Sequence, residues 1–543
     1  MKTVRLFFAV VVGTLVLLSA SRAASTDGSD EIPVGRPIEE AVDRLIDARL
    51  SAKGVLAAPQ VDDAALIRRL TLDLVGRVPT EVEARAFVAS KDENKRHALV
   101  ERLLSSKGFV EHQASELDTI LTGGEGSLGE YLRFAVGENR SWDRMFREIL
   151  LADRLDDGAK GADAFLKTRI KDIDRLTNDV SVRFFGVNIS CAQCHDHPYT
   201  EWTQDHYYGM KSFFNRTFEN GGFVAERSYG LVSYKTTTGE SRTARPRFLV
   251  GEPLSEPDSK EPSAEEQQEE KKRLDQLQKQ KKPVPPPSYS RRARLVEEGL
   301  KTSQAEYFAR AVVNRMWHRF FGRGLVMPLD QMYSQNPPSH PELLEWLARD
   351  LMEHGYDVRR LVHGLVLSRA YSRSSRWEGE RPAPELFAVA IPRPLSPRQY
   401  AFSLRLATLD PGTFSATVER GEVEKRIEEV GKQAQPMTSW FVQPQDGFQV
   451  SVDEALLLSN GEQVQKDLLN DNEGRLVRRL LEEKDPAARV ELAVWTILSR
   501  PPGEEESRVL VEYLVGRDSG RPREACQQLV WILLTGTEFR FNY

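Results

Sequence analysis

Residues 186–217 read GVNISCAQCHDHPYTEWTQDHYYGMKSFFNRT and hold the densest group of side chains in the sequence that can bind a metal or a cofactor. Cys191 and Cys194 are two of only three cysteines among 543 residues, and His195 follows directly. C-x-x-C-H is the attachment motif of c-type haem. Two thiols at this spacing can each form a thioether with a haem vinyl group, and the histidine after them can ligate the iron. The motif therefore predicts haem c bound by Cys191, Cys194 and His195.

A second axial ligand for the iron is expected in the same stretch. Met210 and His206 lie far enough from His195 along the chain to reach the opposite face of a haem ring. His197 follows His195 by two residues, and so close a neighbour reaches that face less readily. The sequence therefore suggests Met210 or His206, ahead of His197, as the further metal ligand.

Two other interpretations of the cysteines stay open at this point. In an oxidising compartment, Cys191 and Cys194 can form a local disulfide. They can also bind zinc or another transition metal together with His195, His197 or His206. The cofactor is therefore haem c in the first interpretation, with zinc or no cofactor as the alternatives.

Each interpretation corresponds to a different function. With haem, the protein transfers electrons to a redox partner protein. With a structural cysteine pair, it is a non-redox scaffold or a carbohydrate-associated module. With a metal ion, it is a metal-dependent enzyme in which Asp196 or Glu201 acts as the acid–base group.

Composition limits the choice of partner. The chain has 75 Lys and Arg against 81 Asp and Glu, which gives a net charge of −6. Nucleic-acid binding depends on a basic surplus that neutralises phosphates, so nucleic acid is not an expected partner. Hydrophobic residues make up 40% and charged residues 29%, as is typical of a globular protein. A chain of this length is expected to form two or more domains.

The periodicity of apolar residues upstream of the motif is helical and predicts an N-terminal helical domain over residues 36–217. Thr80 and Glu83 have the spacing of a capping box at the start of a helix. Gly186 is expected to end the helix that leads into the C-x-x-C-H motif.

Downstream of the motif the pattern changes twice. Residues 218–253 are richer in Val, Tyr and Thr, which predicts a β-rich connector such as a short hairpin. Residues 254–290 carry a run of Glu, then Lys and Arg, then PVPPP, and form a linker that is either a solvated helix or disordered. Residues 291–543 are helical again. The predicted fold class is mainly α: two helical domains joined by a short β-rich segment and a charged, Pro-rich linker.

The second half contains one further group of polar residues. Arg315, His318 and His340 are candidates for an anion or sugar site, although such residues more often serve as structural groups. Ser339 and Glu342 have the spacing of a second capping box.

Long ordered motifs also carry a family resemblance. AVDRLIDARL, LIRRLTLDLVGRVPTEVEARAFV, LVERLLSSKGFVEH and SVRFFGVNISCAQCHDHPYTEWTQDHYYGMKSFF resemble the planctomycete cytochrome-like domain of unknown function fifteen forty-nine. FARAVVNRMWHRFFGRGLV, NPPSHPELLEWLARDLMEHGYDVRRLVHGLVLSRAYSRSS and LVWILLTGTEFRFNY are similar to its C-terminal partner domain, fifteen fifty-three. The resemblance implies that residues 36–217 are a cytochrome-like domain and that Cys191, Cys194 and His195 are its haem-attachment residues. It implies no settled activity.

The N-terminus has the pattern of a secretory signal peptide over residues 1–24. Two early basic residues precede the apolar run 6–18, and small residues follow it, with cleavage expected after Ala23 or Ala24. The apolar run is short for a membrane span, so we expect no transmembrane segment after cleavage, and an uncleaved anchor is the alternative. The protein is therefore expected to be exported, to the periplasm or the cell surface.

This interpretation predicts the start of the mature chain. N-terminal sequencing of the native protein, purified from a periplasmic or envelope fraction, should read from about Ala24 onward. Recovery of the chain from the cytoplasm with Met1 still in place would contradict export.

Overall fold

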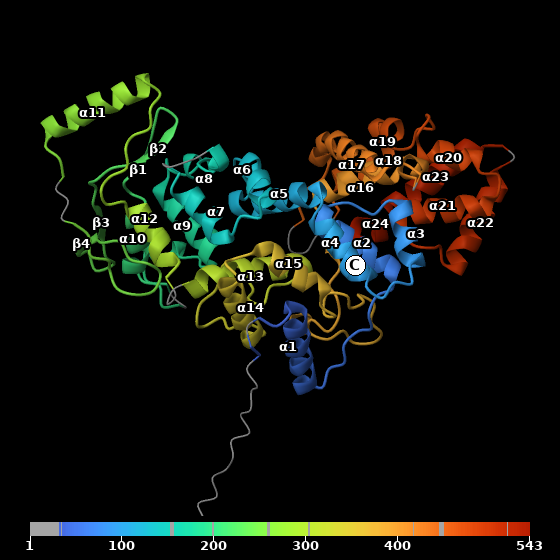
Figure 1. Ribbon diagram of the computed structural model, residues 1–543, viewed down its shortest axis with the longest axis horizontal. Helices are drawn as coiled ribbons and strands as arrows, with labels where there is room; N and C mark the ends of the chain where they lie inside the picture. The colour runs from blue at the N-terminus through green and yellow to red at the C-terminus, as the bar shows by residue number, and fades with distance from the viewer. Residues whose placement is uncertain are drawn as a thin grey trace, which may run out of the picture. The chain divides into compact units, whose positions relative to one another are not determined.

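The structure, a computed structural model, describes residues 32–33, 35–152, 157–197, 200–257, 261–301, 305–415, 417–444, 450–518 and 520–543. Residues 34–543 form one compact unit. Helices dominate it and the strands are short, which confirms the mainly-α class (Figure 1). Within the part of the chain that is described, no helix is long and apolar enough to cross a membrane. The predicted signal peptide lies outside the described residues.

The predicted first domain is a series of helices joined by short turns. They are α1 (Ile38–Lys53), α2 (Asp63–Val75), α3 (Glu81–Ala89), α4 (Lys95–Leu104), α5 (Lys107–Thr122), α6 (Gly129–Gly137), α7 (Trp142–Leu150), η1 (Asp157–Ala159), α8 (Ala164–Lys167), α9 (Ile173–Phe185), η2 (Ser190–Gln193) and α10 (Gln204–Ser212). The capping box of Thr80 and Glu83 is present at the start of α3, as predicted. Gly186 ends α9 in the left-handed conformation at φ 68°, also as predicted.

Two antiparallel hairpins follow α10, in the predicted β-rich connector. β1 (Thr217–Asn220) pairs with β2 (Phe223–Glu226), and β3 (Val232–Lys235) pairs with β4 (Ser241–Ala244).

The charged linker contains a helix, α11 (Ala264–Lys279), in which every residue is described and none is buried. It lies beside the first hairpin, where the Asn220 side chain donates to the Leu274 carbonyl at 3.2 Å (Figure 1). Of the two alternatives for this segment, the solvated helix is the one that the structure shows.

In the described residues of the second half, helices alternate with loops, and one short strand pair is present. Its elements are α12 (Arg291–Gly299), α13 (Ala305–Phe321), α14 (Pro341–Glu353), α15 (Val358–Leu367), η3 (Pro384–Leu386), β5 (Arg393–Pro394), α16 (Pro397–Ala407), η4 (Pro411–Phe414), α17 (Arg420–Ala434), η5 (Gln435–Trp440), α18 (Val452–Asn460), α19 (Glu462–Asp467), α20 (Leu476–Glu482), α21 (Pro486–Leu498), α22 (Glu504–Asp518), α23 (Pro522–Thr535), α24 (Thr537–Arg540) and β6 (Phe541–Asn542). The predicted capping box at Ser339 is wrong. His340 precedes α14 without a side-chain cap, because Pro341 already starts the helix.

The two halves pack against each other over many elements. α9 contacts α13, α1 contacts α14 and α15, α4 contacts α15, and α3 contacts α21. Leu72 of α2 and Val78 belong to the same hydrophobic core as α16, α20, α21 and α23. The two halves of the chain therefore share apolar core as well as surface contacts.

A buried carboxylate joins segments from the whole length of the chain. Asp73 in α2 is 3% exposed. Its two oxygens accept hydrogen bonds from the Tyr371 hydroxyl at 2.7 Å, from both terminal nitrogens of Arg393 at 2.8 and 2.7 Å, and from the Asn542 amide at 2.9 Å. Four donors compensate the desolvation of the charge, so Asp73 can be ionised in the interior. We call this group the Asp73 junction.

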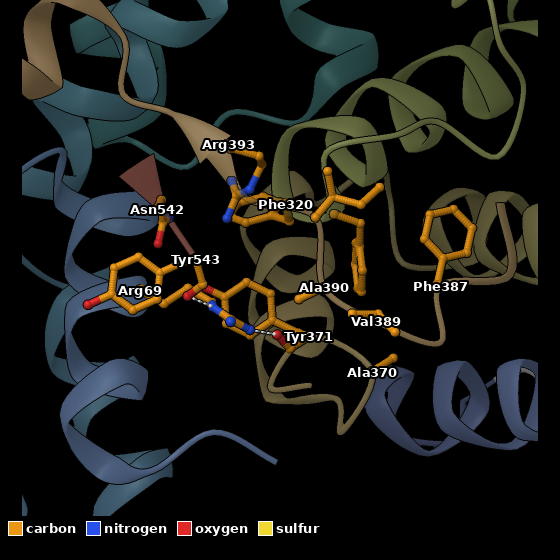
Figure 2. Close-up of a pocket in the computed structure, with 12 residues that line it drawn as sticks. Arg69, Phe320, Ala370, Tyr371, Phe387, Val389, Ala390, Arg393, Asn542 and Tyr543 are labelled. Atoms are coloured by element: carbon orange, nitrogen blue, oxygen red, sulfur yellow. Dashed lines mark hydrogen bonds between the residues drawn. The ribbon is translucent and has the colours of Figure 1, made fainter. Parts of the chain in front are cut away.

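A small cavity lies beside the Asp73 junction (Figure 2). Arg69, Tyr371, Arg393 and Asn542 line it together with apolar side chains, and its volume is about 20 Å³. That is room for about one water molecule, which is too little for a substrate. Arg69 is occupied with the chain itself, since its guanidinium donates to the backbone oxygens of Tyr371 and Tyr543. The cavity therefore belongs to the packing of the fold.

The Asp73 junction predicts a large and specific loss of stability. Asp73→Ala leaves the half-buried Arg393 guanidinium without its carboxylate, and should lower the free energy of unfolding by about 3–5 kcal/mol. Asp471→Ala is the matched control, because it removes a surface ion pair with Arg523 and should cost about 0–1 kcal/mol. Chemical denaturation measures both. Equal losses in the two variants would contradict the role given to Asp73.

A second prediction concerns pH. Burial alone would raise the pKa of Glu83, but Arg77, which donates to it at 2.7 and 3.0 Å, and the Thr80 N–H lower it to about 2. The ionised Glu83 therefore stabilises the fold fully above pH 4.5, and this stabilisation is lost as the pH falls through about 2. Glu83→Gln should cost about 3 kcal/mol at pH 7.

Denaturation of wild type and Glu83→Gln as a function of pH tests this expectation. The difference between the two proteins should shrink as the pH falls from 4.5 towards 2. Glu462→Gln is the control, because Glu462 and its partner Lys466 are both largely exposed and the pair should contribute little at any pH. A difference that grows on acidification would contradict the assignment.

Candidate functional site

The C-x-x-C-H motif lies in the turn between α9 and α10. After Gly186 ends α9, Val187 pairs with Gln331 of the second half, and residues 190–193 form the short η2 turn. An added Cβ at Gly186 would lie 2.8 Å from the Met332 sulfur, so both the close approach and the positive φ require glycine. The backbone that follows α9 thus places Cys191 and Cys194 close to the segment of the second half that contains Gln331 and Met332.

The residues predicted to attach haem face solvent. Cys191, Cys194 and His195 are all exposed, and the two sulfurs are not bonded to each other. Both thiols are therefore accessible to a reagent from outside the protein, which formation of thioether bonds requires. The third cysteine, Cys526, is buried in α23, as expected for a small hydrophobic residue.

The imidazole of His195 has a defined orientation. Its Nδ1 lies 2.8 Å from the backbone oxygen of Asp196. A carbonyl oxygen only accepts hydrogen bonds, so in the neutral imidazole this contact places the hydrogen on Nδ1 and the lone pair on Nε2. Metal-binding histidines commonly use one ring nitrogen as ligand while the other donates to a carbonyl. The arrangement of His195 has this form.

The first residues of α10 hold the motif turn in place. The Gln204 side-chain amide donates to the carbonyl of Cys194 at 3.2 Å, and the Gln204 backbone N–H donates to Asp196 Oδ1 at 2.9 Å. The Tyr208 hydroxyl donates to the Gln193 carbonyl at 3.1 Å. The sequence analysis missed Gln204, since a glutamine at the start of a helix has no pattern that indicates a contact with the preceding motif.

The candidates for a further metal ligand all have structural contacts. Met210 is 0% exposed on the inner side of α10. His206 Nδ1 accepts from the Thr203 N–H at 3.1 Å and so caps α10, and burial together with Arg247 lowers its pKa. The backbone N–H of His197 donates to the Trp202 carbonyl at 2.7 Å. The identity of the distal ligand stays a prediction.

The same residues bear on the zinc alternative. Among the residues that the structure describes, no three His, Cys, Asp or Glu side chains are grouped closely enough to hold a metal ion.

The second half of the chain contributes to the surroundings of the motif. The Asn188 backbone N–H and side-chain amide donate to the backbone and side-chain oxygens of Asp330 at 2.8 and 3.2 Å. The Met332 N–H donates to the Gly186 carbonyl at 3.0 Å. Nothing in the sequence indicated these partners, because they lie more than a hundred residues away along the chain.

The polar group in the second half has a structural environment. Arg315 is buried and donates to the Val182 carbonyl at 2.7 Å, which joins α13 to α9. Burial lowers its pKa to about 10, and burial lowers the pKa of His340 to about 4. His318 is half-buried. Arg315 and His340 are thus part of the protein interior, where an anion or sugar from solvent does not reach them.

Comparison with known families agrees with the motifs. Residues 41–219 match the family described as PSCyt2, protein of unknown function (DUF1549), and residues 291–408 match PSD1, protein of unknown function (DUF1553). The first match includes the motif turn and α10, and the second runs from α12 to the end of α16. Comparison with curated proteins and with solved structures found no match. The chain belongs to the proteins in which a DUF1549 region is followed by a DUF1553 region.

Proposed function

We propose that this protein is an exported electron-transfer protein that binds one c-type haem. Cys191 and Cys194 would form the two thioether bonds, and His195 would be the proximal ligand. The observation that carries the proposal is the His195 ring, whose Nδ1 is held by the Asp196 carbonyl, beside two exposed and unbonded thiols. When bound, haem supplies one-electron redox chemistry, tuned by its axial ligands and its surroundings.

The chain's own residues prepare this site. The motif must present two thiols and one imidazole nitrogen close together: Cys191 lies in η2, Cys194 is the residue directly after η2, and His195 follows. Gln204 and Tyr208 hold the carbonyls of Cys194 and Gln193, which keeps the backbone of the turn in one conformation. Backbone bonds of this kind limit the orientations of the side chains, and this lowers the entropic cost of binding a rigid group.

Localisation is part of the same proposal. Covalent haem attachment takes place outside the cytoplasm, and the signal-like residues 1–24 would direct the chain there. A periplasmic or cell-surface location would also give access to a redox partner protein. Met210 and His206 on α10 are the candidates for the distal position, with His197 third.

The alternatives differ in what they require of the cysteines. A scaffold or carbohydrate-associated module would use Cys191 and Cys194 only as a disulfide that braces the turn. Such a bridge closes a loop of two residues and would add little stability, because so short a loop has little entropy to lose. A metal-dependent enzyme would need a ligand group, and in the described residues the side chains at the motif do not form one.

One set of variants separates these functions. The protein should be made in an exporting host that has haem-attachment machinery, and its absorption spectrum and polypeptide mass should be measured. Wild type should be coloured and heavier by one haem. Cys191→Ser and Cys194→Ser should each lose one thioether, and the double variant should carry no covalent haem. His195→Ala should keep haem attached but show a shifted spectrum and redox potential.

Cys526→Ser is the matched control, because Cys526 is buried in α23, away from the motif in sequence, and its loss should leave the colour unchanged. Colourless wild-type protein without added mass would overturn the haem proposal. If the cysteine variants then lost only a little stability, the scaffold function would replace it, and loss of bound zinc in the same variants would favour the metal-dependent enzyme.

A further inference from the structure

Asp196, the residue after the motif, makes two contacts of different kinds. Its backbone oxygen accepts from Nδ1 of His195 at 2.8 Å. Its carboxylate oxygen Oδ1 accepts from the backbone N–H of Gln204 at 2.9 Å. The same residue therefore touches the proposed iron ligand through its main chain and the start of α10 through its side chain.

Gln204 makes two hydrogen bonds to the residues around His195. It is the first residue of α10 and is 7% exposed. Its side-chain amide donates to the Cys194 carbonyl at 3.2 Å, while its backbone N–H holds Asp196. The two residues that flank His195 are thus both tied to one residue of a helix.

The position at the helix end favours the Asp196 contact. The first N–H groups of a helix have no partner within the helix, and the helix dipole makes this end positive. A carboxylate at this point satisfies a free donor and gains from the dipole. The N-terminal end of α10 therefore itself favours a carboxylate at the position of Asp196.

We propose that Asp196 and Gln204 form a latch that positions His195, with its hydrogen on Nδ1 and its lone pair on Nε2. The inference deepens the haem proposal, on which the role of Nε2 as ligand rests. It assigns Asp196 a positioning role instead of the acid–base role considered from the sequence, because its carboxylate is already bonded to the helix end. Without the latch, the Asp196 carbonyl loses its fixed place and both neutral tautomers of His195 become populated.

The latch is testable in the protein without cofactor. Selective ¹⁵N labelling of histidine, with His195→Gln to assign the signals, reports which ring nitrogen carries the hydrogen at a pH where the imidazole is neutral. Wild type should show the Nδ1–H form for His195. Asp196→Ala should give a mixture of the two forms. Gln204→Met keeps the backbone N–H that bonds Asp196 and removes only the amide donor to the Cys194 carbonyl, so it should give a smaller fraction of the second form.

Asp196→Asn separates positioning from charge, because its side-chain oxygen can still accept from the Gln204 N–H. This variant should retain the Nδ1–H form. Asp205→Ala is the control: Asp205 also lies in the first turn of α10, but it pairs with Arg242 and Tyr234, so its loss should leave His195 unchanged. In protein that carries haem, the redox potentials of Asp196→Ala and Asp196→Asn should differ, because both variants lack the charge and only Asn keeps the contact with the Gln204 N–H.

The outcomes distinguish the latch from the haem proposal. If the tautomer of His195 is the same in wild type, Asp196→Ala and Gln204→Met, the latch is wrong even if haem is attached. If the tautomer responds as expected in a protein that never acquires haem, the latch stands and the haem proposal fails. Asp196 is exposed, so Asp196→Ala is expected to fold, and its thermal unfolding checks this.

Discussion

The packing of the two halves depends on the buried carboxylate of Asp73. An ionised carboxylate inside a protein is stable only when donors surround it, and Asp73 obtains its donors from Tyr371, Arg393 and Asn542. These partners follow α15 or lie in β5 and β6, whereas Asp73 itself lies in α2. Satisfying this single charge therefore brings an early helix, the middle of the second half and the last strand to the same place. The apolar core that includes Leu72 is continuous with this arrangement.

The same interlocking of the two halves determines where the candidate site lies. α9 packs on α13, so the turn that leaves α9 at Gly186 meets the segment around Asp330 and Met332. The motif is consequently bordered by residues that match DUF1549 on one side and residues that match DUF1553 on the other. This arrangement gives a physical reason for the two regions to occur in one chain, since each contributes backbone contacts to the same turn.

Within the site, the chemistry of the residues and their geometry come from different parts of the chain. Cys191, Cys194 and His195 are neighbours in sequence, and their spacing alone suggests thioether attachment and iron ligation. The orientation of His195 is a separate matter, because it depends on where the Asp196 carbonyl is held. That position is determined by Gln204, which lies 8 residues after Asp196 along the chain. The C-x-x-C-H motif therefore indicates which chemistry is possible. The contacts of α10 determine how the His195 imidazole is oriented.

The amino-acid sequence by itself determined the features that depend on near neighbours. Helical periodicity indicated the mainly-α class, and short-range side-chain bonds indicated helix ends, as the capping box of Thr80 with Glu83 and the left-handed Gly186 confirm. Even there, Pro341 displaced the cap expected at Ser339, since a proline can start a helix without one. Tertiary structure alone decided which distant groups meet: the donors around Asp73, the burial of Arg315 and Met210, and the contact of Asn188 with Asp330. Periodicity shows that a residue faces an interior but not which residue it faces, because the partner of a buried charge or amide is chosen by the packing of whole helices.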